Sequence, residues 1–357
     1  MNAIRQITAL SLMAGSLYFI APATASTLMQ KDSSVIDTLF AQTKPQCIGR
    51  YVIGVPESFN NQLHDMIFID DFKIESKPLY PPAFKQRVQL REQALHDAVN
   101  KPENKPENAP FLKEVIILPD GRGVIFDHNE SGTPDIYRKL EAHVYVNMVA
   151  FMITANFRDF SGEKNKQDKI EYLSDGFTEA DANTKPAKLV ALKSLISRLS
   201  GRKDDGIPVA KGICIPNGFI HDDGEKHREK ITFSYENDDF ILGVYTNNTY
   251  MGSDDTLFNR TAEVEKTLKI ANQHTLKKYA LSPGGVPAQA WLSGGPQTID
   301  NNVNPLYEFD LYANEADATP AKPWLTIGIN NFDKKTRYSQ AQMIEIWDRL
   351  VNSLRYK

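Results

Sequence analysis

The order of apolar patterns in the two halves of the chain constrains the fold more than any other sequence feature. Each half opens with an apolar, β-branched segment that contains one cysteine, Cys47 in the first half and Cys214 in the second. Each half ends in a helical pattern with leucines on one face, at residues 192–199 and 347–354. Strand and helix patterns lie between these ends, in a mixed order typical of α+β proteins. The sequence therefore predicts a duplication into two similar α+β domains, each an antiparallel sheet with packed helices.

Apolar periods of 2 and 3.6 residues place the individual elements. In the N-terminal half we expect strands at residues 47–53, 66–74, 115–118, 123–126 and 142–157, and helices at 84–99 and 189–199. In the C-terminal half we expect a strand pattern at 212–220, strands at 231–235, 240–245, 306–312 and 324–329, and helices at 256–270 and 339–354. Proline and glycine predict a solvated loop at 101–110, a charged linker at 201–206, and a loop framed by the glycine pairs 284–285 and 294–295. We divide the mature chain into domains at residues 26–203 and 204–357.

The first 25 residues predict a secretory signal peptide. Arg5 makes the start of the chain basic, residues 7–21 form a nearly uncharged apolar run, and Ala23-Thr24-Ala25 is a small-residue cleavage site. The apolar run is shorter than the ~20 residues that a membrane-spanning helix needs. We therefore expect residues 1–25 to be removed on export, and the mature protein to work outside the cytoplasm without stable membrane insertion.

Charge is nearly balanced over the chain, with 41 Lys and Arg against 45 Asp and Glu and a formal net charge of −4. Proteins that bind phosphate backbones carry a basic surface. We therefore expect no nucleic-acid partner. The apolar content of 41% is that of an ordinary globular chain, which excludes disorder throughout.

The sequence contains no local motif of a familiar catalytic or ligand-binding site. It has no G-x-S-x-G elbow, no H-E-x-x-H, no Walker loop and no Rossmann G-x-G-x-x-G after a strand. The seven histidines have no metal-ligand spacing with either cysteine or with each other. The charged segment 221–227 is interpreted as a hairpin turn, because Lys226 and His227 would repel a cation held by its acids. We therefore expect no catalytic residue, no cofactor and no metal.

Two cysteines in an exported chain leave two arrangements open. Cys47 and Cys214 form a disulfide that joins the two domains at matching points, or they stay separate as buried thiols, since cysteine packs as a small hydrophobe. An oxidising compartment favours the disulfide.

Three stretches of the sequence resemble a known family. They are Cys47-Ile48-Gly49-Arg50-Tyr51 followed by Pro56, Gly212-Ile213-Cys214-Ile215 with Gly218-Phe219-Ile220, and the ending from Trp347-Asp348 to Ser353-Leu354-Arg355. In order and position they are similar to the periplasmic immunity proteins cognate to type VI secretion lipase effectors, in the fourth such family. The resemblance covers nearly the whole mature chain. It implies a two-domain α+β protein that holds a phospholipase effector in the periplasm and protects the producer's own membranes.

The resemblance also implies binding without turnover, so we expect no enzyme activity. A lipase must open an apolar active-site entrance to admit lipid, and a protein that wedges into the entrance or locks the lid stops it without any chemistry. Such an inhibitor needs aromatic or Arg anchors and charge opposite to that of its partner.

We expect two loops of the C-terminal domain to supply part of the partner-binding surface. The expected residues are Asp222, Asp223 and Glu225 in one turn and Tyr250, Asp254 and Asp255 in another. What motivates the hypothesis is exposed acid clustered beside an aromatic side chain. Ordinary solvated turns are the alternative, because acidic residues are mostly exposed in any protein.

Two other classes of function stay open at this point. A secreted hydrolase would need an active site assembled from residues far apart in the sequence. A periplasmic ligand-binding protein would use the glycine loops and the many tyrosines. A neighbouring gene that encodes a lipase with a G-x-S-x-G elbow favours the immunity function over both.

Overall fold

The computed structural model describes residues 34–61 and 66–357. The expected signal peptide at residues 1–25 lies outside the described residues. Residues 34–40 are helical and precede the first strand. Ile36 in this helix is fully buried and belongs to the main hydrophobic core.

In both halves, runs of strands are separated by helices. The elements of the N-terminal half are β1 (Thr43–Ile48), β2 (Tyr51–Pro56), β3 (Asn60–Asn61), β4 (Ile67–Ile69), β5 (Phe72–Pro78), α2 (Pro81–His96), β6 (Leu112–Ile117), β7 (Gly123–Asn129), β8 (Tyr137–Val146), β9 (Val149–Arg158), α3 (Lys166–Ser174), α4 (Glu179–Ala182), α5 (Lys185–Arg198) and β10 (Leu199–Gly201). Those of the C-terminal half are β11 (Gly212–Ile215), β12 (Gly218–His221), β13 (Glu229–Glu236), β14 (Ile241–Asn247), α6 (Thr261–Ile270), β15 (His274–Leu281), β16 (Ala288–Ile299), β17 (Asn302–Ala313), β18 (Trp324–Asn330), α7 (Gln340–Asn352) and β19 (Arg355–Tyr356).

The two halves share one topology. Strands in the order β4-β5-β9-β8-β7-β6 form the N-terminal sheet, and β13-β14-β18-β17-β16-β15 form the C-terminal sheet. In both sheets one helix connects the second strand to the third along the chain, α2 in the first half and α6 in the second. In both, a closing helix and a short strand follow the last sheet strand, α5 with β10 and α7 with β19. The predicted α+β class with two similar antiparallel halves is therefore confirmed.

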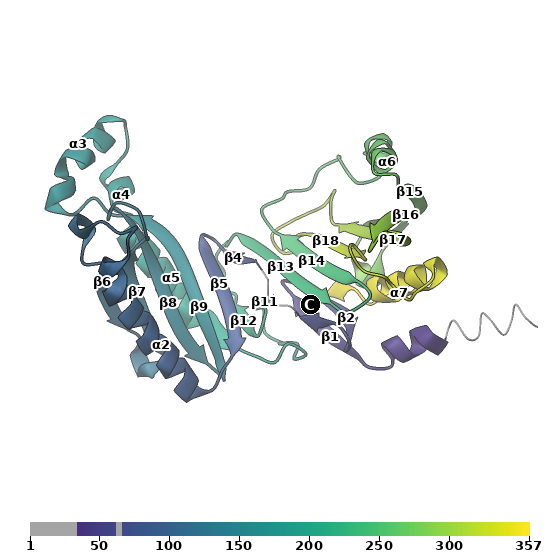
Figure 1. Cartoon of the computed structure of the whole chain (residues 1–357), viewed down its shortest axis with the longest axis horizontal. Helices are drawn as coiled ribbons and strands as arrows, with labels where there is room; N and C mark the ends of the chain where they lie inside the picture. Colours follow the sequence, from purple (N-terminus) through teal and green to yellow (C-terminus); the bar gives the residue numbers. More distant parts are fainter. Residues whose placement is uncertain (1–33, 62–65) are drawn as a thin grey trace, which may run out of the picture.

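The two sheets join edge to edge through their first strands. β4 pairs antiparallel with β13, so that Ile67 lies opposite Ile231 and Ile69 opposite Glu229. A single 13-stranded sheet therefore runs through the described part of the molecule, and Figure 1 shows its two wings meeting near β4 and β13. Backbone hydrogen bonds cross the boundary between the halves, which ties the two wings together.

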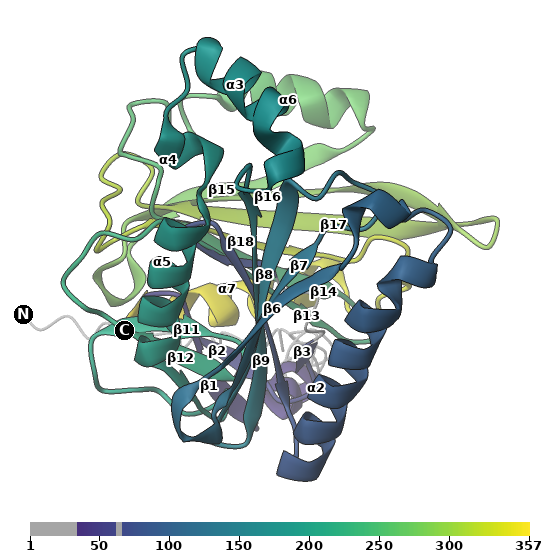
Figure 2. The same cartoon turned by 90° about the vertical axis from the view of Figure 1, so that its left-hand side faces the viewer.

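Helices lie on both faces of this sheet. Figure 2 shows α5 and α2 on opposite sides of the N-terminal strands, and Figure 1 shows α7 and α6 on opposite sides of the C-terminal strands. We call the face packed against α5 and α7 the inner face, and the face toward α2 and α6 the outer face. The inner face is apolar because α7 buries Trp347 and Leu350 against it and α5 buries Leu192 and Leu195. Ser339 caps α7 as predicted, because its hydroxyl accepts from the Gln342 amide and the Gln342 side chain accepts in return.

The opening hairpin of each half packs on the other half. The β1–β2 hairpin pairs through β2 with β19, which follows α7. The β11–β12 hairpin pairs through β12 with β10, which follows α5 in the N-terminal half. Figure 1 shows the β1–β2 hairpin beside α7, far from the N-terminal wing. The main core contains Ile48, Leu192, Ile215 and Trp347 together, so it belongs to neither half alone.

Residues in the left-handed region split three segments that the sequence predicts as single strands. Gly49, at φ 58°, turns the predicted strand 47–53 into the β1–β2 hairpin, and a Cβ there would lie 2.7 Å from Thr246. Asp70, at φ 52°, separates β4 from β5 within 66–74. Asn147, at φ 49°, separates β8 from β9 within 142–157. All three single-strand predictions are wrong for the same reason: Asn, Asp and Gly tolerate a positive φ inside an apolar run.

The glycine pairs of the C-terminal half do not frame a loop. Residues 288–299 form strand β16, and β15 pairs beside it, although neither strand was expected. Gly295 lies inside β16, and a Cβ at this position would meet the backbone oxygen of Asn272 at 2.6 Å. A glycine inside a strand thus marks a close backbone approach and does not interrupt the strand. Helices α3 and α4 were also missed, whereas the four predicted helices occur with ends shifted by a few residues.

A disulfide fastens the two exchanged hairpins to each other. Cys47 on β1 and Cys214 on β11 are bonded, with their Cα atoms 5.6 Å apart. Beside the bond, Gly49 and Cys214 exchange two backbone hydrogen bonds of 2.9 Å. The two chain segments that cross between the halves are therefore linked by both covalent and backbone contacts.

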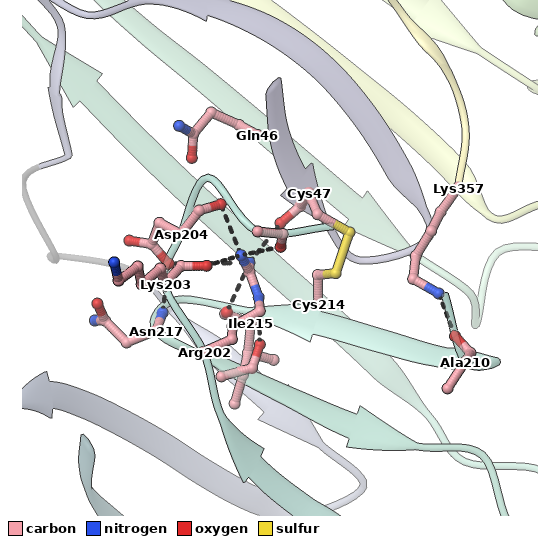
Figure 3. Close-up of a disulfide and its surroundings, with 12 residues drawn as sticks. Gln46, Cys47, Arg202, Lys203, Asp204, Ala210, Cys214, Ile215, Asn217 and Lys357 are labelled. Atoms are coloured by element: carbon pink, nitrogen blue, oxygen red, sulfur yellow. Dashed lines mark hydrogen bonds and ion pairs between the residues drawn. A yellow bond between two sulfur atoms is a disulfide. The ribbon is translucent and has the colours of Figure 1, made fainter. Parts of the chain in front are cut away.

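Arg202 orders the segment that connects the halves, as Figure 3 shows beside the disulfide. Its guanidinium donates to the carbonyl oxygens of Cys47 at 3.0 Å, Ile215 at 3.2 Å and Gly218 at 2.9 Å. Burial lowers the pKa of Arg202, since a charged group loses water here. The expected charged linker is therefore an ordered segment, which a buried cation holds against both exchanged hairpins.

A buried carboxylate completes this junction. Arg50, in the turn of the β1–β2 hairpin, donates to Glu229 at 2.7 Å and to both oxygens of Asp222 at 3.0 Å. Glu229 is 3% exposed at the start of β13. Burial raises the pKa of Glu229, and the Arg50 guanidinium opposes that rise. An ion pair of this kind costs more when one partner is removed than it contributes when intact.

We expect the Cys47–Cys214 bond to stabilise the fold strongly, because it closes a loop with a sequence separation of 167. For a loop of this length the chain-entropy account gives about 5 kcal/mol. Urea unfolding of the oxidised protein and of the reduced protein should differ by up to that amount. A Cys47→Ala/Cys214→Ala variant serves as control, because reductant should leave its unfolding unchanged. Two thiols that alkylate in the non-reduced exported protein would contradict the bond.

We expect Arg50→Met to lower the free energy of unfolding by about 3 kcal/mol near pH 8, because Glu229 is then buried without a cation. The loss should shrink as the pH falls. A raised carboxyl pKa favours the protonated native state, so stability is kept at low pH and lost as the pH rises through the folded pKa. Urea unfolding at about pH 5 and pH 8 measures both effects. Adding Glu229→Gln to Arg50→Met should restore most of the stability, and an equal loss at both pH values would contradict the role of Glu229.

Candidate functional site

Strands of both halves contribute to the outer face of the sheet. The cross-strand register aligns Thr154, Lys73, Phe68, Lys230, Asn247 and Trp324 in one row from β9 to β18. Residues paired across strands point to the same face of a sheet. Near the centre of this row Phe68 is only partly buried and Lys230 is exposed. The outer face is therefore solvent-accessible between α2 and α6, across the boundary between the halves.

An aromatic cluster lies at the C-terminal end of this row. The ring of Trp324 is 5.0 Å from the ring of Tyr250, 5.6 Å from that of Tyr245 and 5.9 Å from that of Tyr312. Tyr250 is 52% exposed, and the other three rings are half-buried. We call these four residues the aromatic cluster. Large, partly exposed aromatic side chains on a firm sheet are the side chains most often found as anchors of protein interfaces.

Both partner-binding loops predicted from the sequence lie at one end of the β13–β14 hairpin. Asn248, which follows β14, accepts from the Glu229 amide at 2.7 Å and donates to the His227 carbonyl at 2.8 Å. These bonds hold the turn before β13 against the loop after β14. The turn with Asp222, Asp223 and Glu225 and the loop with Tyr250, Asp254 and Asp255 are therefore neighbours at this end of the hairpin.

Two of the six predicted residues are exposed but paired with basic side chains of the same chain. Asp222 forms its paired hydrogen bonds with Arg50. Asp223 lies 3.2 Å from Arg198 of α5 and 3.1 Å from His227. Burial raises the pKa of Asp223, but its hydrogen bonds with the Glu225 amide and His227, together with the charge of Arg198, outweigh burial and lower the pKa. Both carboxylates hold the junction between the halves, so their charge is largely matched within the chain.

The other four predicted residues lie at the surface. Glu225 and Asp254 are exposed, and Asp255 is exposed with one oxygen 3.5 Å from Arg260. Tyr250 belongs to the aromatic cluster. Among the predicted residues, Tyr250 is the one that the structure places on the outer face beside other large side chains.

A second set of ion pairs surrounds the turn between β4 and β5. Asp71 pairs with Lys188 of α5 and, at 2.6 Å, with Arg228. The Lys188 hydrogen bond is the main cause of the lowered pKa of Asp71. Asp70 accepts from His227 at 2.8 Å. These contacts join α5, the β4–β5 turn and the segment before β13, so they position the two loops relative to the outer face.

Sequence reasoning missed three members of the aromatic cluster: Trp324, Tyr245 and Tyr312. Each was read as part of an apolar strand, because an aromatic residue in a strand is usually core. The alternation of aromatic and aliphatic residues along β14, β17 and β18 could have predicted that these aromatic side chains lie on the outer face. Tyr245, Tyr312 and Trp324 fall on the half-buried positions of their strands, opposite to the fully buried Val244, Leu311 and Leu325.

The described residues form neither a metal-ligand cluster nor a membrane-spanning helix. In the ranges 34–61 and 66–357, no three His, Cys, Asp or Glu side chains are grouped as a metal ion would require. Among the helices of those ranges, none has the length and apolar character that a bilayer crossing demands. One hollow of about 390 Å³ lies over β5 and β9 beside Met152 and Arg87.

Known protein families and solved structures resemble this chain over most of its length. A family model described as Tle cognate immunity protein 4 N-terminal domain matches residues 44–202, and one described as the C-terminal domain matches residues 206–357. No curated protein matches the sequence. The apo structure of immunity protein TplEi of T6SS from Pseudomonas aeruginosa has 16% identity and a TM-score of 0.64, over 88% of this chain and 97% of that one.

A chain in the Tle4–Tli4 complex is similar to the same degree, with 16% identity and a TM-score of 0.65 over 89% of this chain and 98% of that one. TplEi complexed with "L" peptide gives 16% identity and a TM-score of 0.62, over 89% and 99%. At this identity the solved structures show a shared fold. The two family models show family membership as well as fold, because together they span nearly all of the chain after residue 43. This protein belongs to the family of Tle cognate immunity protein 4, and it is an immunity protein and not an enzyme.

Proposed function

We propose that this immunity protein acts in the periplasm, where it binds a lipase effector through the outer face of its sheet and blocks the active-site entrance or lid. The observation that carries the proposal is the aromatic cluster on the outer face, in a chain whose family is cognate to Tle effectors. A lipase entrance is apolar because it admits lipid, and an exposed cluster of Trp and Tyr is a surface that such an entrance can bind.

The rigidity of the outer face supports inhibition by occlusion. The surface lies on paired strands that span both halves, and the disulfide, Arg202 and Glu229 fix those halves at the centre. A rigid surface loses little conformational entropy when it binds, so more of its contact energy contributes to affinity. Exposed acids at Glu225 and Asp254 lie in the two loops at this end of the β13–β14 hairpin and supply negative charge for a basic rim on the lipase.

The periplasmic location rests on the first 25 residues and on the two cysteines. The A-x-A site at residues 23–25 is typical of a cleaved signal peptide. A disulfide is stable in the periplasm, whereas the cytosol keeps thiols reduced. The division of the mature chain into residues 26–203 and 204–357 belongs to the same proposal, and it is supported by the end of one family match at residue 202 and the start of the other at 206.

Co-expression with a cognate lipase tests the function, and a lipase encoded beside this gene is the candidate to use. The lipase is directed to the periplasm with or without this protein, and growth is followed together with co-purification of the two chains. We expect rescue of growth and a stoichiometric complex that releases no fatty acid from phospholipid vesicles. Lipid hydrolysis by this protein alone, or unchanged toxicity in its presence, would contradict the proposal.

We expect Tyr250→Ala to weaken binding of that lipase by about tenfold or more, because truncating an aromatic anchor typically costs over 1 kcal/mol. The melting temperature should change little, since Tyr250 is half exposed. Titration calorimetry and thermal unfolding measure the two effects. Tyr80→Ala is the matched control, as Tyr80 is 74% exposed at the start of α2 and lies outside the aromatic cluster. Equal affinities for all three proteins would remove the cluster from the interface.

A further inference from the structure

A groove separates α6 from the outer face of the C-terminal sheet. Its volume is about 560 Å³, and Val264 and Leu268 of α6 face Trp291 and Tyr312 of the sheet across it. No side chain of α6 is buried, although Val264 and Leu268 are half-buried toward the groove. The helix therefore lies beside the sheet without burying a side chain against it; Figure 1 shows where α6 lies relative to β15–β17.

A carboxylate lies on the floor of this groove. The register aligns Lys278, Trp291, Asp310, Gly328 and Gly243 in one row on the outer face. One Asp310 oxygen lies over Gly328, 3.0 Å from where a Cβ would stand. A Cβ at Gly243 would meet no atom within 4 Å. Asp310 thus has the Trp291 ring on one side and two glycines, Gly328 and Gly243, on the other. We call the strip of surface over these two glycines the open track toward the Asp310 carboxylate.

The Asp310 carboxylate has no hydrogen-bond or ion-pair partner among the described residues. The charged groups that surround it are Glu308 on the same strand, Arg260 and Glu263 at the start of α6, and Lys278 on β15. Arg260 is paired with Glu315 at 2.8 Å, and Lys278 lies over the Trp291 ring and 3.5 Å from Glu265. Both nearby cations are therefore engaged elsewhere. Burial, together with repulsion from Glu308, raises the pKa of Asp310 to about 7.

In the N-terminal half, the acid beneath the outer helix has a cation from that helix as its partner. There α2 packs on the outer face, and its Arg91 donates to the buried Glu141 of β8 at 2.6 Å and 2.8 Å. His128 and His143 complete the shell around that carboxylate. β8 and β17 hold the same position in the order of their sheets. The N-terminal half thus supplies its own cation, Arg91, to Glu141. The C-terminal half supplies no cation to Asp310.

We propose that the groove between α6 and the outer face receives a lysine or arginine side chain of the bound effector, with Asp310 as its anionic partner. The inference rests on the proposed function and names where part of the effector binds. The aliphatic stem of the basic side chain lies along Gly328 and Gly243, and its charged end reaches Asp310 beside Trp291. An aromatic face and a carboxylate together are a suitable environment for such a cation.

The chemistry of the groove selects this kind of occupant. Glu308 and Asp310 repel an anion, so a phosphate or a fatty-acid carboxylate is disfavoured at the floor. A purely apolar side chain would leave the Asp310 carboxylate desolvated without a partner, which costs binding energy. A basic side chain satisfies both parts of the groove, since its stem is apolar and its end is cationic.

Asp310→Asn tests the proposal, because it predicts opposite effects on stability and affinity. The melting temperature of the free variant should rise near pH 8, where Asp310 is charged in the native state, and by less near pH 5. The sign follows from the raised pKa: the native state prefers the protonated acid, so its stability falls as the pH rises through about 7. Affinity for the purified lipase encoded beside this gene should fall about tenfold to a hundredfold near pH 8, the range expected for loss of a charge-assisted hydrogen bond.

Two further variants separate the groove from general charge. Gly243→Val adds a side chain on the open track, where the built Cβ meets no atom, so we expect it to fold normally and to bind the lipase at least tenfold more weakly. Asp238→Asn removes an equal charge from the exposed β13–β14 turn and should bind like the wild type. Wild-type affinity should also fall as the pH drops from about 8 to 6, and this dependence should be lost in Asp310→Asn.

The outcomes distinguish the two proposals. If the wild-type protein fails to bind the lipase, the proposed function fails. If the wild type binds and both Asp310→Asn and Gly243→Val bind equally well, the function stands and the groove is not part of the interface. A lower melting temperature of Asp310→Asn would make the acid a structural residue, and this too would overturn the groove proposal.

Discussion

The exchange of opening hairpins between the halves is the constraint on which the rest of the structure depends. Each short three-stranded sheet takes two strands from one half and one from the other. Neither half therefore has a complete inner layer of its own, and the core forms only when the whole chain has folded. The Cys47–Cys214 bond lies where the exchanged segments cross, so it reports on the assembly of both halves at once.

This shared core explains how a duplicated chain presents one surface. Two separate domains would move relative to each other, as is usual when interdomain contacts are small and polar. Here the β4–β13 pairing, Arg202 and the Arg50–Glu229 pair remove that freedom. The outer face then has a fixed shape across both halves. For an inhibitor without chemistry of its own, a fixed shape is the main source of affinity beyond its anchors.

The sequence predicts the class of fold and the duplication, because these follow from the order of apolar patterns and from matched closing helices. The prediction of strand ends fails where a tight turn reverses the chain inside an apolar run, as at Gly49 and Asn147. The alternation of apolar and polar residues continues on both sides of such a turn, so the sequence pattern does not mark it. It could not show the hairpin exchange or the partners of Asp222 and Asp223. Arg50 and Glu229 are 179 residues apart, and a contact over that distance leaves no trace in spacing. Tyr250 was found because it stands in a turn, whereas Trp324 was hidden in a strand.

The two halves differ in the partners of the acids that lie beneath α2 and α6. Glu141 is fully matched by Arg91 and two histidines, and α2 closes over it with Phe84 and Leu95 buried. Asp310 is left without a cation, and α6 buries nothing. A half-buried carboxylate without a cation destabilises the free protein at neutral pH, because burial penalises its charged form. Under the groove proposal, the basic side chain of the effector supplies in the complex the cation that Arg91 supplies to Glu141 within the N-terminal half.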